Sequence, residues 1–374
     1  MGAEFVFSLF VAACATATPT QQRNPKNPFE LYVKSVRDSQ SHNVSALIDQ
    51  HDPSESEIQT VKLLRDKRGR FHKTVVGPLR WEGVESVDDG NRWVTLFPDE
   101  RTVQDQESPL RYPHDETERL KLAEKNYTFS YDGESSVAGR RSVRLVATPH
   151  WPTLETRRYF LDAETLYPLR VETVGDHSAI EFTTIEIAFP QSIDPYAFRL
   201  PDTRGFRVFK YDHPHEITTL PSAEHELGFR PILPSRLNLG FRIQEKQVSV
   251  RSSWETLVLR LTDGLVRATV YEFSVDAKFD LDKINNRTDG QTATVKVMVV
   301  ASMPEEARRQ LLDSFVQPEM DFLGNQPLPV SSLSRILEPN TGPLALANLD
   351  KSSPPSELSL VEEFRRATEG RWTL

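Results

Sequence analysis

The stretch RYFLDAETLYPLRV, residues 158–171, decides the fold class of this chain. Apolar, aromatic and β-branched residues dominate the segments 157–161 and 169–174, and this composition is typical of β-strands. No long helical pattern separates the two segments. The stretch therefore indicates two neighbouring strands of an antiparallel sheet.

The same pattern recurs on both sides of this stretch. Asp89-Gly90 and Asp132-Gly133 are typical hairpin turns between such segments, because glycine adopts positive φ without penalty. Regularly spaced strands without long helices between them predict one antiparallel, curved sheet. Its further candidate strands are residues 61–64, 71–76, 92–97, 127–131, 142–147 and 180–189.

A helix is predicted just before this β-rich region. Asn27 can cap its first turn, and Pro28 takes the first helical position, where its missing N–H costs nothing. The apolar residues that follow are spaced as one helical stripe. We expect this helix to cover part of the apolar face of the sheet; the stripe consists of Phe29, Tyr32, Val33 and Val36.

A second β-rich region follows a segment rich in proline. Residues 190–234 contain seven prolines, and proline cannot donate a backbone hydrogen bond to a sheet, so we expect a linker or a segment that follows a sheet edge. Candidate strands then lie at 241–250, 254–261, 265–273 and 292–301. A helix that starts at Ser302, with Glu305 completing a capping box, should pack on this second sheet.

The N-terminus carries an apolar run from Phe5 to Ala13. It is shorter than the roughly 18–20 residues that span a bilayer, and it fits the core of a signal peptide over residues 1–20. Val11-Ala12-Ala13-Cys14 matches a lipobox, in which the cysteine is lipidated. The alternative is ordinary cleavage after Ala15 or Ala17, which discards Cys14. Either way we expect export to the periplasm or cell envelope.

Composition excludes several classes of protein. The chain has 374 residues, with 45 Lys+Arg against 54 Asp+Glu, and this acidic balance argues against nucleic-acid binding. One cysteine excludes an intrachain disulfide and a multi-cysteine metal site. The P-loop, dinucleotide, zinc-protease and nucleophile-elbow motifs are absent. We therefore predict no enzyme, no cofactor and no metal, and a hydrolase with an unrecognised site is the enzymatic alternative.

Histidines gather only in the proline-rich segment. His213 and His215 would share one face of a strand, but Pro214 separates them. A solvated, irregular segment is favoured over a metal site there.

Aromatic residues supply the candidate ligand site. Trp93 and Phe97 alternate with Val94 and Leu96 and so share one face of their strand. Tyr127, Phe129 and Tyr131 likewise share one face. Such a face packs against its own helix, or it forms a groove for an acyl chain, since each buried methylene contributes about 0.8 kcal/mol. Both interpretations stay open.

The order of several segments resembles the RseB/MucB family of periplasmic regulators of envelope-stress sigma factors. The N-terminal domain of that family is similar to the LolA/LolB lipoprotein carriers. The opening stretch 158–171 is one of these segments. The others are VGPLR (76–80), DGNRWVTLFP (89–98), VAGRRSVRLV (137–146), LPSRLNLGFR (233–242), TDGLVRATV (262–270) and MPEEARR (303–309).

The resemblance implies an α+β, mainly β fold: a LolA-like antiparallel half-barrel with a covering helix, and a smaller C-terminal α/β sandwich domain. With the patterns above, it places the half-barrel at 28–190, a linker at 191–233, the second domain at 234–318 and a Pro/Ser-rich tail with a short helix at 319–374.

The resemblance also implies a function. Such a protein senses a lipid or lipoprotein in the half-barrel, binds a membrane-bound anti-sigma factor and releases it on a lipid-like signal. The alternative is a lipoprotein carrier without a sigma-factor role. A lipobox is not typical of the soluble members of the family.

Overall fold

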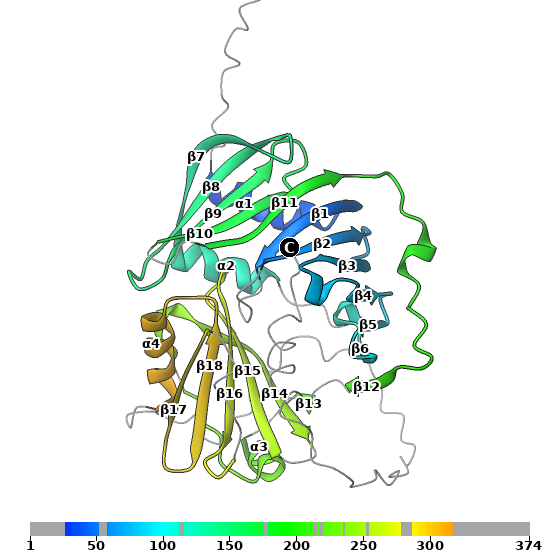
Figure 1. Cartoon of the computed structure of the whole chain (residues 1–374). Helices are drawn as coiled ribbons and strands as arrows, with labels where there is room; N and C mark the ends of the chain where they lie inside the picture. The colour runs from blue at the N-terminus through cyan, green and yellow to red at the C-terminus, as the bar shows by residue number, and fades with distance from the viewer. Residues whose placement is uncertain are drawn as a thin grey trace, which may run out of the picture.

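The structure is a computed structural model, and it describes residues 27–51, 58–111, 116–175, 179–211, 215–216, 220–234, 236–251, 254–277 and 286–316. Within these ranges the chain forms a large sheet and a small sheet (Figure 1). The predicted signal peptide, Cys14, His213 and the predicted tail helix lie outside the described residues.

The large sheet has twelve strands among the described residues, in the order β12-β6-β5-β4-β3-β2-β1-β11-β10-β9-β8-β7. Neighbouring strands are antiparallel, except that β12 runs parallel to β6. The strands are β1 (Val44–His51), β2 (Ile58–Arg65), β3 (Phe71–Gly77), β4 (Glu85–Asp88), β5 (Arg92–Phe97), β6 (Thr102–Glu107), β7 (Tyr127–Val137), β8 (Arg140–Pro149), β9 (Thr156–Asp162), β10 (Pro168–Val174), β11 (Ala179–Ala188) and β12 (Arg207–Tyr211).

β1 lies in the middle of this sheet and joins distant parts of the chain. It pairs with β2 on one side and with β11 on the other, where Ser45 lies opposite Ala188. The Asn43 amide donates to the carbonyls of Pro190 and Gln191 at 3.1 and 2.8 Å, which fastens the start of β1 to the end of β11.

One face of the large sheet is covered by α1 (Pro28–Ser39) and is called the inner face here. The predicted cap is confirmed, because the Asn27 side chain accepts from the N–H of Phe29 at 3.0 Å. Tyr32 is buried, and its ring centroid lies 5.0 Å from that of Phe129 and 5.1 Å from that of Tyr159. The apolar stripe of α1 thus packs on the sheet as predicted.

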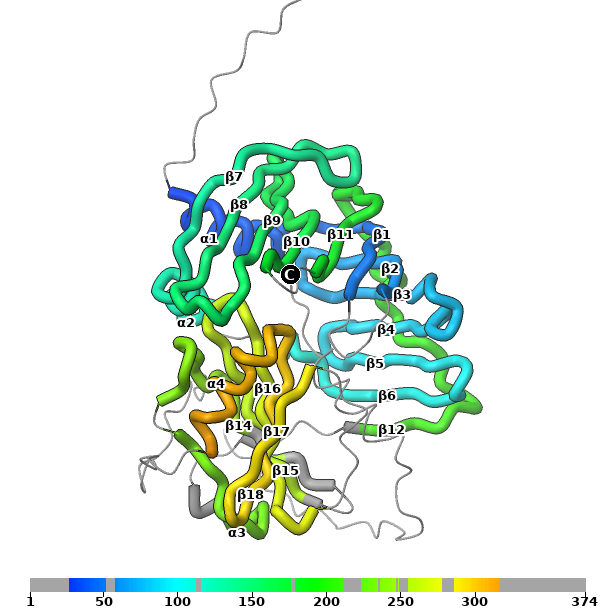
Figure 2. The backbone as a smooth tube through the Cα atoms, turned by 60° about the vertical axis from the view of Figure 1, so that its left-hand side comes forward, coloured from blue at the N-terminus to red at the C-terminus, as the bar shows by residue number. Residues whose placement is uncertain are grey.

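The opposite face of β3–β6 is covered by the proline-rich segment. Leu200 and Phe206 pack against the buried side chains of Val94, Leu96 and Val103. The short helix η3 (Pro195–Phe198) lies on this face too, because Nδ1 of His72 is 2.9 Å from the Ala197 carbonyl. The segment then continues as the edge strand β12, next to β6 (Figure 2).

The small sheet has six strands in the part of the chain that the structure describes, in the order β13-β14-β15-β16-β18-β17. Its apolar face is buried against α4 (Glu305–Val316). This helix starts later than predicted. Pro304 takes the N-cap position, and its carbonyl accepts from the Arg308 N–H at 3.0 Å. The strands are β13 (His215–Glu216), β14 (Arg242–Arg251), β15 (Trp254–Thr262), β16 (Arg267–Ser274), β17 (Arg287–Gln291) and β18 (Val295–Ala301), with α3 (Leu220–Leu227) between β13 and β14.

The sequence did not predict α2 (Glu116–Asn126). Figure 1 shows α2 between the large sheet and the small sheet. Its residues are mostly charged, and only Leu120 and Ala123 supply buried apolar side chains. The pattern is too weak to indicate a helix, since the surface that buries it comes from elsewhere in the chain.

Candidate functional site

The five predicted aromatic residues all lie on the inner face of the large sheet. Residues that pair directly on neighbouring strands point the same way. From Gln50 and Ala46 of β1, which share a face, the pairing can be followed to both ends of the sheet. One path is Gln50, Phe182, Val171, Tyr159, Leu145 and Tyr131, and the other is Ala46, Leu63, Lys73, Ser86, Thr95 and Gln104.

At the β7 end of the inner face, the aromatic side chains pack under α1. The Phe129 ring lies 5.2 Å from Phe29 and 5.0 Å from Tyr32. Tyr127 and Tyr131 join the same apolar cluster, and Tyr127 is 3% exposed. The covering helix therefore contacts Phe129 directly, and Tyr127 and Tyr131 belong to the same cluster.

At the other end, Trp93 and Phe97 lie apart from that cluster. Trp93 is half-buried and packs edge to face on Phe71, with ring centroids 5.7 Å apart. Phe97 is 4% exposed. The structure thus brings Tyr127, Phe129 and Tyr131 together and keeps Trp93 and Phe97 as a second aromatic group across the sheet.

A turn of the small sheet inserts into the large-sheet part of the molecule. It consists of Asp263, Gly264 and Leu265 between β15 and β16, and is called the docking turn here. Asp263 is completely buried, and Leu265 belongs to the apolar cluster of the inner face. A Cβ atom at Gly264 would lie only 2.2 Å from the backbone nitrogen of Ala123 in α2. Only glycine fits such a close approach.

Four side chains of the large-sheet part hold the docking turn. The Tyr127 hydroxyl donates to the Asp263 carboxylate at 2.6 Å. Three others donate to backbone carbonyls of the turn: Asn126 to Asp263 at 2.7 Å, Arg119 to Gly264 at 3.1 Å and Arg157 to Leu265 at 3.2 Å.

Burial makes this polar contact sensitive to the loss of any partner. Burial raises the pKa of Asp263 above its ordinary value, although the bonds from Tyr127 and from the backbone of Leu265 and Val266 oppose the shift. Burial also raises the pKa of Tyr127 well above its usual range. An unpaired group in this environment would cost about 1–3 kcal/mol.

Sequence reasoning missed this contact. Asp263-Gly264 has the composition of an exposed hairpin turn, and its burial depends on α2, which was not predicted. Arg157 gave a usable signal: it alternates with Tyr159 and Leu161 and therefore occupies an inner-face position in the predicted strand. Arg157 forms an ion pair with Glu181 at 2.6 Å there.

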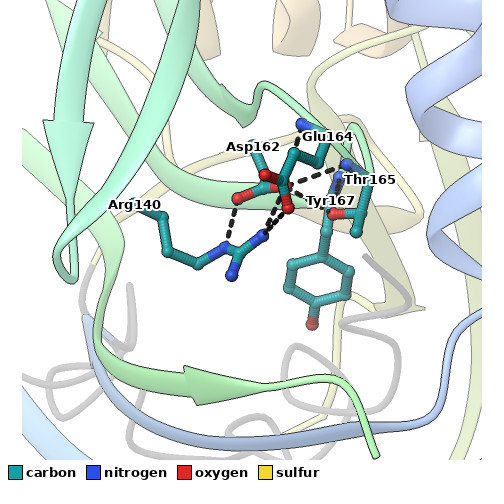
Figure 3. Close-up of polar contacts among 5 residues, drawn as sticks. All are labelled: Arg140, Asp162, Glu164, Thr165 and Tyr167. Carbon is teal, nitrogen blue, oxygen red and sulfur yellow. Dashed lines mark hydrogen bonds and ion pairs between the residues drawn. The ribbon is translucent and has the colours of Figure 1, made fainter. Parts of the chain in front are cut away.

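The stretch that decided the fold class has a structural role. The Asp162 carboxylate accepts from the backbone N–H groups of Glu164 and Thr165 at 3.1 and 2.9 Å and from the Arg140 guanidinium at 2.5 Å (Figure 3). Burial alone would raise the pKa of Asp162, but these bonds outweigh it and hold that pKa below its ordinary value. Asp162 thus fixes the turn between β9 and β10.

Within the described ranges, no three His, Cys, Asp or Glu side chains are grouped as metal ligands would be. No helix in those ranges is both long and apolar enough to cross a bilayer.

Comparison with solved structures places this fold beside that of MucB. A crystal structure of MucB is 16% identical, with a TM-score of 0.51, over 77% of this chain and 96% of that chain. The MucA/MucB complex of Pseudomonas aeruginosa gives 14% identity and a TM-score of 0.53, over 77% of this chain and 97% of that chain. No protein-family model and no curated protein sequence matches the chain.

Identities this low establish the fold alone. The resemblance to MucB predicted from the sequence is confirmed at that level. The predicted fold class is confirmed as well: a mainly β, α+β protein with a helix-covered antiparallel half-barrel and a smaller second sheet with its own helix.

Proposed function

We propose that this protein is a non-enzymatic binding protein of the cell envelope. Its inner face binds the acyl chain of a lipid or lipoprotein, and its small-sheet part engages a membrane-bound anti-sigma factor. The observation that carries the proposal is a MucB-like fold whose inner face holds aromatic side chains at both ends. MucB has itself been solved in complex with MucA.

We propose that ligand binding and partner binding belong to different domains. The half-barrel at 28–190 would hold the ligand, and the unit at 234–318 would hold the protein partner, with 191–233 as the connection and 319–374 as the tail. Arg119 supports communication between the two units. Its guanidinium donates both to the Tyr32 hydroxyl of α1, at 3.3 Å, and to the docking turn. A ligand that displaces α1 would break the hydrogen bond from Arg119 to Tyr32 and would thereby disturb the bond from Arg119 to the docking turn.

Ligand binding should stabilise the protein. Decanoylglycerol, kept below its micelle concentration and at 100 times its Kd, is expected to raise the free energy of unfolding by about 2.7 kcal/mol. Urea unfolding with and without the ligand measures the change, and glycerol alone, which lacks the chain, is the control. No stabilisation, together with no lipid in the purified protein by mass spectrometry, would remove the lipid-binding proposal.

The partner separates this function from the lipoprotein-carrier alternative. A gene neighbour that encodes a sigma factor beside a single-span anti-sigma factor would favour the regulator. Co-purification with the periplasmic part of that anti-sigma factor tests the contact directly. A protein that transfers lipoprotein between membranes and retains no such partner would be a carrier instead.

We also propose that Cys14 is lipidated and anchors the mature chain to the envelope. Radiolabelled palmitate is expected to enter the wild-type protein and not the Cys14→Ser variant. Equal labelling of both, or labelling of neither, contradicts the lipid anchor and leaves cleavage after Ala15 or Ala17.

A further inference from the structure

Two buried N–H donors on the inner face lack an acceptor. Gln104 is 6% exposed, and its Nε2 forms no hydrogen bond within the described residues. Nε1 of Trp93 is likewise buried and without an acceptor there. Trp93 lies on β5 and Gln104 on the adjacent strand β6, where Gln104 pairs with Thr95, two residues along from Trp93. The two donors are therefore diagonal neighbours on the same face.

The surroundings of these donors are aromatic. Phe71 packs on Trp93, Phe97 follows on the same strand face, and Phe209 of β12 pairs with Gln104. A buried amide or indole N–H left unpaired costs roughly 1–3 kcal/mol. A ligand that brings an acceptor into this setting recovers that cost.

The carboxylate of Asp88, next to these donors, favours a neutral acceptor over a charged one. Asp88 pairs with Trp93 across β4 and β5 and is completely buried. The Asp88 carboxylate accepts from the Ser108 hydroxyl at 2.9 Å and from the Gly90 N–H at 2.8 Å, and both bonds favour its charged form. A second carboxylate next to Asp88 would be repelled. A neutral carbonyl oxygen satisfies the two donors without that penalty.

We propose that Trp93 and Gln104 form a subsite for the carbonyl group of an acyl ester or amide. The indole and the amide donate to the carbonyl oxygen, and Phe71 and Phe97 contact the first methylenes of the chain. This subsite rests on the proposed function, because it places the polar end of the acyl ligand at the β5–β6 side of the inner face. It discriminates acylated molecules from ligands that are merely apolar.

A matched pair of ligands tests the subsite. Decanoylglycerol has the ester carbonyl, and 1-O-decylglycerol has the same chain and glycerol group but an ether in its place. The wild-type protein is expected to bind the ester about tenfold more tightly than the ether, since each recovered hydrogen bond contributes about three- to tenfold. Trp93→Phe and Gln104→Met should each reduce this preference to about threefold while still binding the ether.

The control variant is Trp151→Phe. Trp151 packs against the apolar cluster of the small-sheet part, so this variant should keep the tenfold preference. A second readout follows the indole itself: among the five tryptophans, the ¹⁵N–¹H signal missing in Trp93→Phe should shift with the ester and stay unchanged with the ether.

The outcomes separate this subsite from the wider function. If ester and ether bind the wild type equally, the subsite is wrong and the lipid-binding function stands. If the ester is preferred equally by all variants, its carbonyl binds elsewhere and the subsite is again wrong. If neither ligand binds, the proposed function fails and the subsite fails with it.

A further ligand distinguishes the two sources of an acyl carbonyl. N-decanoylglycinamide carries the amide linkage of an acylated lipoprotein N-terminus, whereas decanoylglycerol carries the ester of a glycerolipid. Both should lose affinity in Gln104→Met. The ligand that binds the wild-type protein more tightly identifies the source.

Discussion

In the Gly264→Ala variant, the docking turn is expected to leave its position against α2. The free energy of unfolding should be about 3–4 kcal/mol lower than that of the wild type. The new Cβ would lie 2.2 Å from the backbone nitrogen and 2.5 Å from the Cα of Ala123. A helix backbone cannot rotate aside as a side chain can. The residue also has φ +111, a region that alanine adopts only under strain. Withdrawal of the turn would leave the Tyr127 hydroxyl without its buried acceptor and would remove the shorter of the two hydrogen bonds that the Asn126 amide donates.

Small-angle scattering and urea unfolding measure this effect. We expect a larger radius of gyration and two unfolding transitions in place of one, because the two parts no longer stabilise each other. The matched control is Gly139→Ala, where φ is +71 but no atom lies within 4 Å of the new Cβ. That variant should lose only about 1 kcal/mol and keep its compact dimensions. If both variants behave alike, the docking turn does not hold the molecule together.

The Glu272→Gln variant is expected to be more stable than the wild type near neutral pH. Glu272 lies completely buried in β16, and burial raises its pKa to about 8 although Oε2 accepts from the Ile232 N–H at 2.8 Å. Its Oε1 has no hydrogen-bond partner within the described residues. The native state therefore holds this carboxyl in its neutral form at pH 7.

The direction in which stability changes with pH follows from the pKa of Glu272 in the native and in the unfolded protein. The unfolded chain releases the Glu272 proton near the ordinary pKa of 4.5, whereas the native protein retains it to about pH 8. The unfolded state thus binds fewer protons in this window, so stability falls as pH rises, by about 1.4 kcal/mol per unit. At pH 7 the loss amounts to about 3 kcal/mol relative to pH 4.5. Glutamine does not titrate, so the variant escapes this loss.

Urea unfolding from pH 5 to pH 8 tests the prediction. The difference in stability between Glu272→Gln and the wild type should grow steadily with pH, even if burying the amide shifts the whole curve by a constant amount. Glu305→Gln, at the exposed start of α4, should follow the wild type. A difference that is constant over this range would mean that Glu272 is ionised in the native protein.

The sequence predicted much of the fold because local patterns coincide with burial. Every strand predicted between residues 58 and 189 is present, and the cap at Asn27 begins α1. β1 was missed, although Val44, Ala46 and Ile48 alternate along it. β4 was missed as well, and its four residues are too few to establish a period.

The arrangement of the inner face could be predicted only strand by strand. Alternation placed Trp93 with Phe97 and Tyr127 with Phe129, and pairing in the structure agrees. Which groups would lie near each other depends on strand order, and strand order depends on pairings between distant segments. The donor Gln104 was missed because β6 has the sequence TVQDQE, in which a buried amide looks like an exposed one.

The central position of β1 also governs how this protein acquires its fold. β1 can pair with β2 as soon as both are made, but its other edge must wait for β11, at the far end of the half-barrel sequence. Asn43 finds its carbonyl partner 147 residues further along the chain. Contacts of such high sequence separation slow folding, and an edge that waits unpaired is open to pairing with another chain. During synthesis, the middle of the sheet is therefore completed late, and aggregation competes with folding in the interval before β11 arrives.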